Sequence, residues 1–313
     1  MTRKLTDYLT IGAKGIAMGA ADVIPGVSGG TIAFITGIYE ELVISIKSVN
    51  ASLIKTLFKQ GVPAAWKQVN GNFLVAVLAG ILTSIFSLAK LISYLLSNHQ
   101  MLVWAFFFGL IVGSTIFVGK KINKLNAMTI FMFLVGTAIA YFITIATPAI
   151  TPQGLWFIFI SGVIAICAMI LPGISGSFIL LLMGKYEYIL NAVKDFKILI
   201  LFVFAMGCAV GIVAFSNVIA WLFKRYYNAT LALLAGFMLG SLNKLWPWKE
   251  VVESRLNSHG EMVPFIEKSI GPARFAEITG QDTIMIPVLI SAAAGLILIF
   301  VFERFTNGVD PKA

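Results

Sequence analysis

Charged residues, histidine and cysteine are all scarce in this chain of 313 residues. Only 12% of the residues are charged and 59% are hydrophobic, whereas a soluble domain carries roughly 25% charged residues. A soluble fold cannot hide that much apolar surface from water. The apolar stretches are about 20 residues long, which is the length that crosses a bilayer as a helix. We therefore expect an integral membrane protein.

The few histidines and cysteines leave little material for catalysis or metal binding. His99 and His259 fall in expected loops, while Cys167 and Cys208 fall in apolar segments, where cysteine acts as a small packing residue. An intramembrane lipid phosphatase needs a histidine or carboxylate set with nucleophile spacing, which the sequence does not show. We expect no enzymatic activity, no metal and no other cofactor.

The net charge of +9 is attributed to topology and not to nucleic-acid binding. Lys and Arg collect in cytoplasmic loops, and no basic run is interleaved with aromatic residues. Arg3 and Lys4 precede the first apolar pair, and the lysine-rich loop 47–71 follows it, so both ends of that pair are expected in the cytoplasm. The same rule, applied along the chain, predicts a multi-pass protein whose N- and C-termini are both cytoplasmic.

Ten apolar segments are expected to be helical. They cover about 9–24, 29–46, 72–97, 101–118, 126–147, 155–171, 176–193, 198–223, 230–247 and 284–302.

One phrase occurs twice within this apolar sequence. Residues 25–47 read PGVSGGTIAFITGIYEELVISIK and residues 172–194 read PGISGSFILLLMGKYEYILNAVK, and nine of the 23 paired positions are identical. Proline lacks an amide proton and glycine loosens the backbone, so each phrase is expected to break a helix. Because both ends of the first broken pair are expected on one side, each pair is predicted to be a re-entrant hairpin.

Three spanning helices follow each hairpin, so the second half is expected upside down relative to the first. The predicted fold is an all-α integral membrane protein with an inverted-topology repeat, each half one re-entrant helical hairpin plus three transmembrane helices. Residues 1–313 form a single membrane domain, with repeat one at about 9–147, repeat two at about 155–303 and an extracytoplasmic loop at about 249–283. Inverted repeats with matching broken helices are typical of secondary transporters.

The two breaks carry groups that suit an anion. Non-helical backbone is tolerated at membrane depth only where protein or water covers it. Its exposed amides, together with the hydroxyls of nearby serine and threonine side chains, are hydrogen-bond donors for a phosphate or carboxylate. The alternative is that PGxSG is only a tight turn whose serines cap helices. The candidate phosphate-binding residues are Pro25, Gly26, Ser28, Gly29, Gly30, Thr31, Pro172, Gly173, Ser175, Gly176, Ser177 and Lys14.

Charges within apolar segments are further candidates, because they are costly to place in a membrane. Asp22 and Lys14 fit either mutual pairing or the binding of proton and phosphate. Glu40 and Glu187 occupy equivalent positions of the two phrases and also fit a place near the lipid headgroups, while Lys90 also fits snorkelling. The candidates for proton coupling or pairing are Asp22, Glu40 and Glu187, and a wider set adds Lys90, Tyr39 and Tyr186.

Two matched Gly-x3-Gly pairs lie outside the phrases. Gly109 and Gly113 correspond to Gly236 and Gly240 when the two halves are aligned. This spacing favours close packing of helices over ligand contact.

The segment ADVIPGVSGGTIAFITGIYEEL (21–42), followed by LPGISGSFILLLMGKYEYIL (171–190), resembles the bacterial polyprenyl-phosphate transporter family PopT. The resemblance covers nearly the whole chain. It implies a flippase of the bacterial plasma membrane that moves undecaprenyl phosphate from the outer to the cytoplasmic leaflet and so recycles the cell-wall lipid carrier. It implies no settled catalytic residues. Coupling to the proton gradient is a hypothesis.

The main alternative is a secondary transporter for a small water-soluble anion, which needs a closed aqueous path instead of a lateral opening to lipid. A structural scaffold would leave the two polar breaks unexplained. The sequence leaves open whether the chain forms a homo-oligomer, which ion is coupled and which prenyl phosphates are selected.

Overall fold

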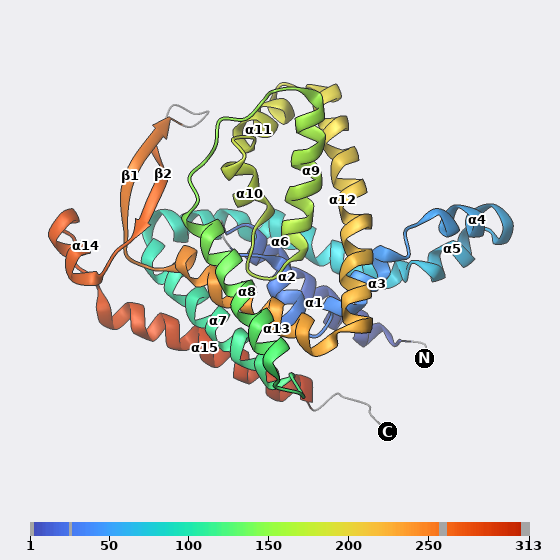
Figure 1. Cartoon of the computed structure of the whole chain (residues 1–313), viewed down its shortest axis with the longest axis horizontal. Helices are drawn as coiled ribbons and strands as arrows, with labels where there is room; N and C mark the ends of the chain where they lie inside the picture. Colours follow the sequence, from blue (N-terminus) through green and yellow to red (C-terminus); the bar gives the residue numbers. More distant parts are fainter. Residues whose placement is uncertain (1–2, 25–26, 257–261, 308–313) are drawn as a thin grey trace.

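The computed structural model describes residues 3–24, 27–256 and 262–307, and Figure 1 shows their arrangement. The helices are α1 (Leu5–Asp22), α2 (Gly29–Ile35), α3 (Tyr39–Lys47), α4 (Ala51–Gln60), α5 (Val62–Gln68), α6 (Gly71–Asn98), α7 (Gln100–Lys120), α8 (Ala127–Ile145), α9 (Leu155–Ile170), α10 (Gly176–Leu182), α11 (Tyr186–Lys194), α12 (Ile198–Arg225), α13 (Tyr227–Ser241), α14 (Pro272–Thr279) and α15 (Met285–Asn307). A 3-10 turn, η1 (Leu242–Leu245), follows α13, and the strands β1 (Lys249–Leu256) and β2 (Met262–Ser269) form an antiparallel hairpin.

The expected helical segments are present, and the chain is a mostly helical membrane protein. Four stretches of the described residues are long and apolar enough to cross a membrane, namely 71–88, 100–120, 127–145 and 198–245, the last of which contains both α12 and α13. The apolar helices 155–170 and 285–301 are shorter.

The expected arms 29–46 and 176–193 are each broken a second time, which the sequence analysis missed. Gly37 has a φ of 74° and Gly184 a φ of 61°, a left-handed conformation that suits glycine. The resulting bend between α2 and α3 is 116°. Each phrase therefore forms two short helices in place of one arm.

Two expected loops also contain regular structure. The lysine-rich loop 47–71 holds α4 and α5, and Asn50 caps α4 by accepting a hydrogen bond from the amide of Ser52 at 2.8 Å. The expected loop at 249–283 holds the β1–β2 hairpin, in which Lys249 pairs with Ser269, and α14. The all-α prediction leaves out this hairpin.

The long helices pack in four pairs: α1 with α6, α9 with α12, α7 with α15, and α8 with α13. Figure 1 shows α9 and α12 side by side. Glycines lie at these contacts: a Cβ on Gly109 would overlap the carbonyl of Ala292 in α15, and one on Gly236 would overlap that of Phe133 in α8. The expectation that the Gly-x3-Gly pairs serve close helix packing is confirmed.

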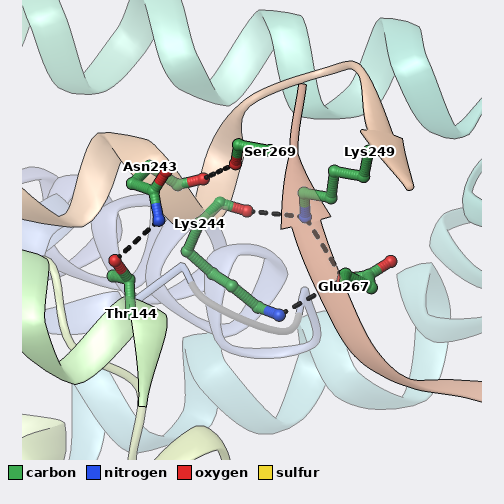
Figure 2. A network of polar contacts seen from close by, with 6 residues as sticks. All are labelled: Thr144, Asn243, Lys244, Lys249, Glu267 and Ser269. Atoms are coloured by element: carbon green, nitrogen blue, oxygen red, sulfur yellow. Dashed lines mark hydrogen bonds and ion pairs between the residues drawn. The ribbon is translucent and has the colours of Figure 1, made fainter. Parts of the chain in front are cut away.

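The hairpin is held on the end of α13 by a network of polar contacts, shown in Figure 2. One oxygen of Glu267 lies 3.3 Å from Nζ of Lys244 and 3.4 Å from Nζ of Lys249. Lys249 also donates to the carbonyl of Lys244 at 2.8 Å and lies 3.6 Å from the ring centre of Trp104. Asn243 donates to Thr144 of α8 at 2.9 Å.

Burial dominates the ionisation of Lys249. It lowers the pKa of Lys249 to about 7, with help from the charge of Lys244 and against the opposing charge of Glu267. Burial would raise the pKa of Glu267, but the two lysines outweigh it and hold that pKa below its usual value. The network is therefore expected to respond to pH through Lys249.

The close contact at Gly109 predicts a large effect of a bulky side chain. Gly109→Leu should destabilise the protein by roughly 1–3 kcal/mol or more, because a side chain there meets backbone and not free space. Thermal unfolding in detergent measures this. Gly119→Leu is the matched control, since Gly119 lies on the same helix with nothing within 4 Å of its added Cβ. Equal losses in the two variants would contradict the packing account.

The ionisation of Lys249 predicts a pH-dependent stability. The unfolded chain holds this proton up to roughly pH 10, while the folded chain releases it at about pH 7. The unfolded state therefore binds more protons in between, so stability rises with pH across this window, by at most about 1.4 kcal/mol per pH unit.

The thermal midpoint of the wild type should therefore rise from about pH 7 to about pH 9 more than that of Lys249→Met. Lys268→Met is the control, because Lys268 is an exposed lysine on the same hairpin. Parallel pH profiles for the wild type and Lys249→Met would refute this ionisation.

Candidate functional site

The first break lies between α1 and α2. Ser28 is the N-cap of α2, and its Oγ accepts a hydrogen bond from the amide of Gly30 at 3.1 Å. The carboxylate of Asp22 accepts one from the amide of Gly29 at 2.6 Å. A Cβ on Gly29 would overlap that carboxylate, so the contact requires glycine. The first break thus already holds an anion, the carboxylate of Asp22.

The second break lies between α9 and α10 and is built differently. Gly173 has a φ of 90°, and a Cβ there would lie 2.9 Å from the carbonyl oxygen of Phe237 in α13. Ser175 is the N-cap of α10, but its Oγ bonds the Oγ of Ser177 at 2.7 Å and caps no amide. The position equivalent to Asp22 is Met169. The second break therefore lacks the internal carboxylate of the first.

The two breaks contact each other directly. Ser28 donates from its Oγ towards the carbonyl oxygens of Met169 and Leu171, at 3.2 and 3.3 Å. The amide of Gly173 donates to Oγ1 of Thr31 at 2.8 Å. Ser28 and Thr31 are buried, with exposed fractions of 1% and 0%. Segments separated by about half the chain thus satisfy each other's polar groups in the core.

Most of the candidate phosphate-binding residues therefore lie in one buried cluster. A Cβ on Gly30 would lie 2.8 Å from the carbonyl oxygen of Ile170, and one on Gly176 would lie 2.7 Å from that of Ala165. The groups that approach these glycines in this structure are protein carbonyls. Pro172 is buried with the cluster, whereas Pro25 and Gly26 lie outside the described residues.

Lys14 lies apart from this cluster. Its Nζ donates to the carbonyl oxygen of Thr36, just beyond the C-terminal end of α2, at 2.7 Å. Asp22 bonds Gly29 instead, so the predicted pairing of Asp22 with Lys14 is not present. Lys185 in the second half similarly donates to the carbonyl of Thr151, at 3.1 Å. Both lysines satisfy backbone carbonyls near the second interruption of each phrase.

The two equivalent glutamates have different surroundings. Glu40 lines a cavity of about 510 Å³ between α3 and α12, together with Lys47, Lys224 and Tyr227. Glu187 is exposed and lines a cavity of only about 70 Å³ beside the loop 148–150. Neither cavity is lined by a described residue of either break.

The wider set of candidates is dispersed. Tyr39 is buried and packs edge-on against Phe34 and Phe223, with ring centres 5.0 and 6.1 Å away. Tyr186 is 37% exposed, and Lys90 is exposed on α6. The structure therefore does not bring these three side chains to the breaks.

One functional candidate escaped the sequence analysis. Lys244 and Thr144 line a small cavity with Gly173, Ser175 and Phe178 of the second break. The Nζ of Lys244 lies 4.8 Å from the ring centre of Phe178. Lys244 is a lysine inside the expected apolar segment 230–247, so the rule that singled out Lys90 would also have found it.

Comparison with known proteins points to one family. Residues 18–263 match a family described as "VCA0040-like: Undecaprenyl phosphate translocase-like". A "Polyprenyl-phosphate transporter" of Vibrio cholerae is 46% identical over 307 residues, which is 98% of this chain and 100% of that protein. A "Polyprenyl-phosphate transporter" of Staphylococcus aureus is 33% identical over 252 residues, 75% of this chain and 84% of that protein. No solved structure matches.

The family match, residues 18–263, covers both phrases. The chain belongs to the VCA0040-like, undecaprenyl phosphate translocase-like family.

Proposed function

We propose that this chain is a transporter that moves undecaprenyl phosphate from the outer to the cytoplasmic leaflet of the bacterial plasma membrane, and not an enzyme. The observation that carries the proposal is the buried contact between the two duplicated breaks, made by Ser28, Thr31 and Gly173. The relatives named polyprenyl-phosphate transporters support the substrate class. A lipid with an anionic head needs protein only around its headgroup, since the prenyl chain can stay in the bilayer.

The proposed topology is an inverted repeat within one membrane domain, 1–313, with both termini cytoplasmic and 249–283 outside. The helix pairs support it. The α1–α6 pair of repeat one corresponds to α9–α12 of repeat two, and the α7–α15 pair corresponds to α13–α8. Each α1–α2 and α9–α10 unit then acts as a re-entrant hairpin whose break faces its counterpart.

The two halves are packed differently, which supports alternation between two states. Helix α3 of repeat one packs across on α12 of repeat two. Its equivalent, α11, packs on α10 and α12 of its own half. In a symmetric pair of repeats, the opposite arrangement is the second state, in which α11 packs on α6 and α3 is released.

Asp22 supplies a route to proton coupling. The amide of Gly29 donates its hydrogen bond to the carboxylate of Asp22. Without this carboxylate, the same amide could donate to a phosphate oxygen. Protonation removes the negative charge and weakens this bond, so a phosphate can compete for the amide more easily. Phosphate and proton would then be carried together, while a deprotonated Asp22 restores the empty state.

The proposed site predicts that the serines of both breaks matter for transport. Purified protein in liposomes should move undecaprenyl phosphate from the outer to the inner leaflet. The fraction of headgroups accessible from outside should therefore fall with time. Ser28→Ala and Ser175→Ala should each slow this by about tenfold, since a charge-assisted hydrogen bond contributes about 1.5–3 kcal/mol.

Ser114→Ala is the matched control, because Ser114 is equally buried but bonds a carbonyl of its own helix. If both serine variants translocate the lipid as the wild type does, the proposed site is wrong but the proposed lipid substrate stands. No translocation by intact wild-type protein would overturn the proposed function and favour the alternative, a transporter for a small water-soluble anion.

The role of Asp22 predicts that one substitution abolishes the response to a proton gradient. The Asn side chain of Asp22→Asn keeps an oxygen that can accept a hydrogen bond from Gly29, but the amide cannot take up a proton. At equilibrium the distribution of the lipid between the two leaflets should not respond to an imposed proton gradient in this variant, whereas in the wild type a one-unit gradient coupled to one proton should shift the leaflet ratio by about tenfold.

Asp195→Asn serves as the comparison, since Asp195 is an exposed acid paired with Lys197 outside the breaks. If wild-type transport does not respond to the gradient, the coupling hypothesis is wrong. If the Asp22→Asn variant still responds to the gradient, Asp22 is not the coupling residue and another acid takes up the proton.

A further inference from the structure

The lysine pair that holds the hairpin is rich in hydrogen-bond donors and poor in acceptors. Lys244 and Lys249 both contact the same oxygen of Glu267, at 3.3 and 3.4 Å. Trp104, whose ring Lys249 covers, carries a buried indole N–H with no hydrogen-bond partner among the described residues. The two ammonium groups thus share one carboxylate and one carbonyl, and the indole N–H beside them is unpaired among the described residues. This surplus of donors suits a ligand with several anionic oxygens.

The charges at this cluster are not balanced. Two lysines face a single carboxylate, which leaves an excess of up to one positive charge, depending on how far Lys249 is protonated near pH 7. A phosphate monoester carries about −1.5 to −2 charges at neutral pH. It would balance the lysine pair if the carboxylate of Glu267 moved away, whereas a phosphodiester carries only one charge.

Lys244 connects this cluster to the second break. Its side chain lies between Glu267 of the hairpin and Phe178 of α10. It also lines a small cavity with Gly173 and Ser175. An anion held by Lys244 therefore lies beside the break that has no internal carboxylate.

An apolar groove adjoins the same cluster. It has a volume of about 850 Å³ and lies between α7, α8, α13 and the end of the hairpin. Its walls include Phe108, Tyr141, Phe142 and Trp246, and its few polar residues include Asn243 and Ser269, which flank Lys244 and Glu267 in the network of Figure 2. Tyr141 and Phe142 of α8 are 46% and 65% exposed, so the groove opens at the surface of the protein.

We propose that Lys244 and Lys249 form a receiving site for the phosphate monoester of a polyprenyl phosphate, with the first isoprene units of its chain in the groove along α8 and α13. Glu267 occupies this site as an internal anion and is displaced by the phosphate. The site would pass the headgroup to Ser175 and Ser177. This inference rests on the proposed function and adds a location that precedes the contact between the breaks.

Binding of farnesyl phosphate, measured by calorimetry on the full-length protein in detergent, tests the site. Lys244→Gln should weaken binding by about tenfold, because it removes a charge-assisted contact. Glu267→Gln should tighten binding severalfold, because it removes the competing anion and leaves both lysines in place. A merely structural role for this ion cluster would not produce a gain of affinity.

Lys268→Gln and Glu277→Gln are matched controls, because they change the same charges at exposed positions of the same segment. Lys244→Arg keeps the charge and should retain binding. Inorganic phosphate and farnesol should each bind at least about tenfold more weakly than farnesyl phosphate, because each lacks one half of the interaction. A short-chain phosphatidylglycerol should also bind more weakly, because its phosphodiester carries a single charge.

The outcomes separate this inference from the proposed function. If the wild type translocates undecaprenyl phosphate while Lys244→Gln and Glu267→Gln bind farnesyl phosphate as the wild type does, the receiving site is wrong and the proposed function stands. If inorganic phosphate binds as tightly as farnesyl phosphate, the groove is not a chain site. If the wild type neither binds farnesyl phosphate nor translocates the lipid, both proposals fail.

Discussion

The structure depends on one constraint: backbone that leaves a helix in a buried core must find its hydrogen-bond partners within the protein. The two breaks, which are separated by about half the chain, meet this constraint by facing each other. Ser28 donates to the carbonyls of the second break, and Thr31 accepts from its Gly173 amide. These bonds satisfy polar groups at the start of α2 and before α10, and so help both short helices to stay in the core. The same groups are those with which a phosphate would interact, so the contact between the breaks is both a structural requirement and the proposed site.

The two phrases share nine of 23 paired residues but differ in their surroundings. The first break carries Asp22 as its own anion, whereas the second has Met169 at that position and Lys244 nearby. Helix α3 packs on α12 of the other half, whereas α11 packs on α10 and α12 of its own half. A duplicated framework with unequal charges offers two different environments for one headgroup along the proposed path. The proton hypothesis, the receiving site and the alternation of α3 and α11 all follow from this inequality.

Much of this was predictable from the sequence. Hydrophobic runs of about 20 residues are a strong signal, and the positions of both breaks follow from proline and glycine chemistry. The second interruption at Gly37 and Gly184 was missed because each glycine lies within an apolar run, where only its positive φ reveals a bend. The β1–β2 hairpin escaped because Lys249 and Glu267 are stabilised by Trp104 and Lys244, contacts distant in sequence. The partner of Asp22 was also unpredictable, since an amide of the break competes with Lys14 for its carboxylate.

The most direct test of the central claim is to locate the headgroup on the protein. An undecaprenyl phosphate analogue with a photoreactive group on its first isoprene unit would be cross-linked to the protein in liposomes, and the labelled peptides identified by mass spectrometry. We expect labels at the two breaks, near residues 22–31 and 169–177, and at 243–249 beside Lys244. Labels confined to α4 and α5, with unlabelled breaks in a protein that still translocates the lipid, would contradict it.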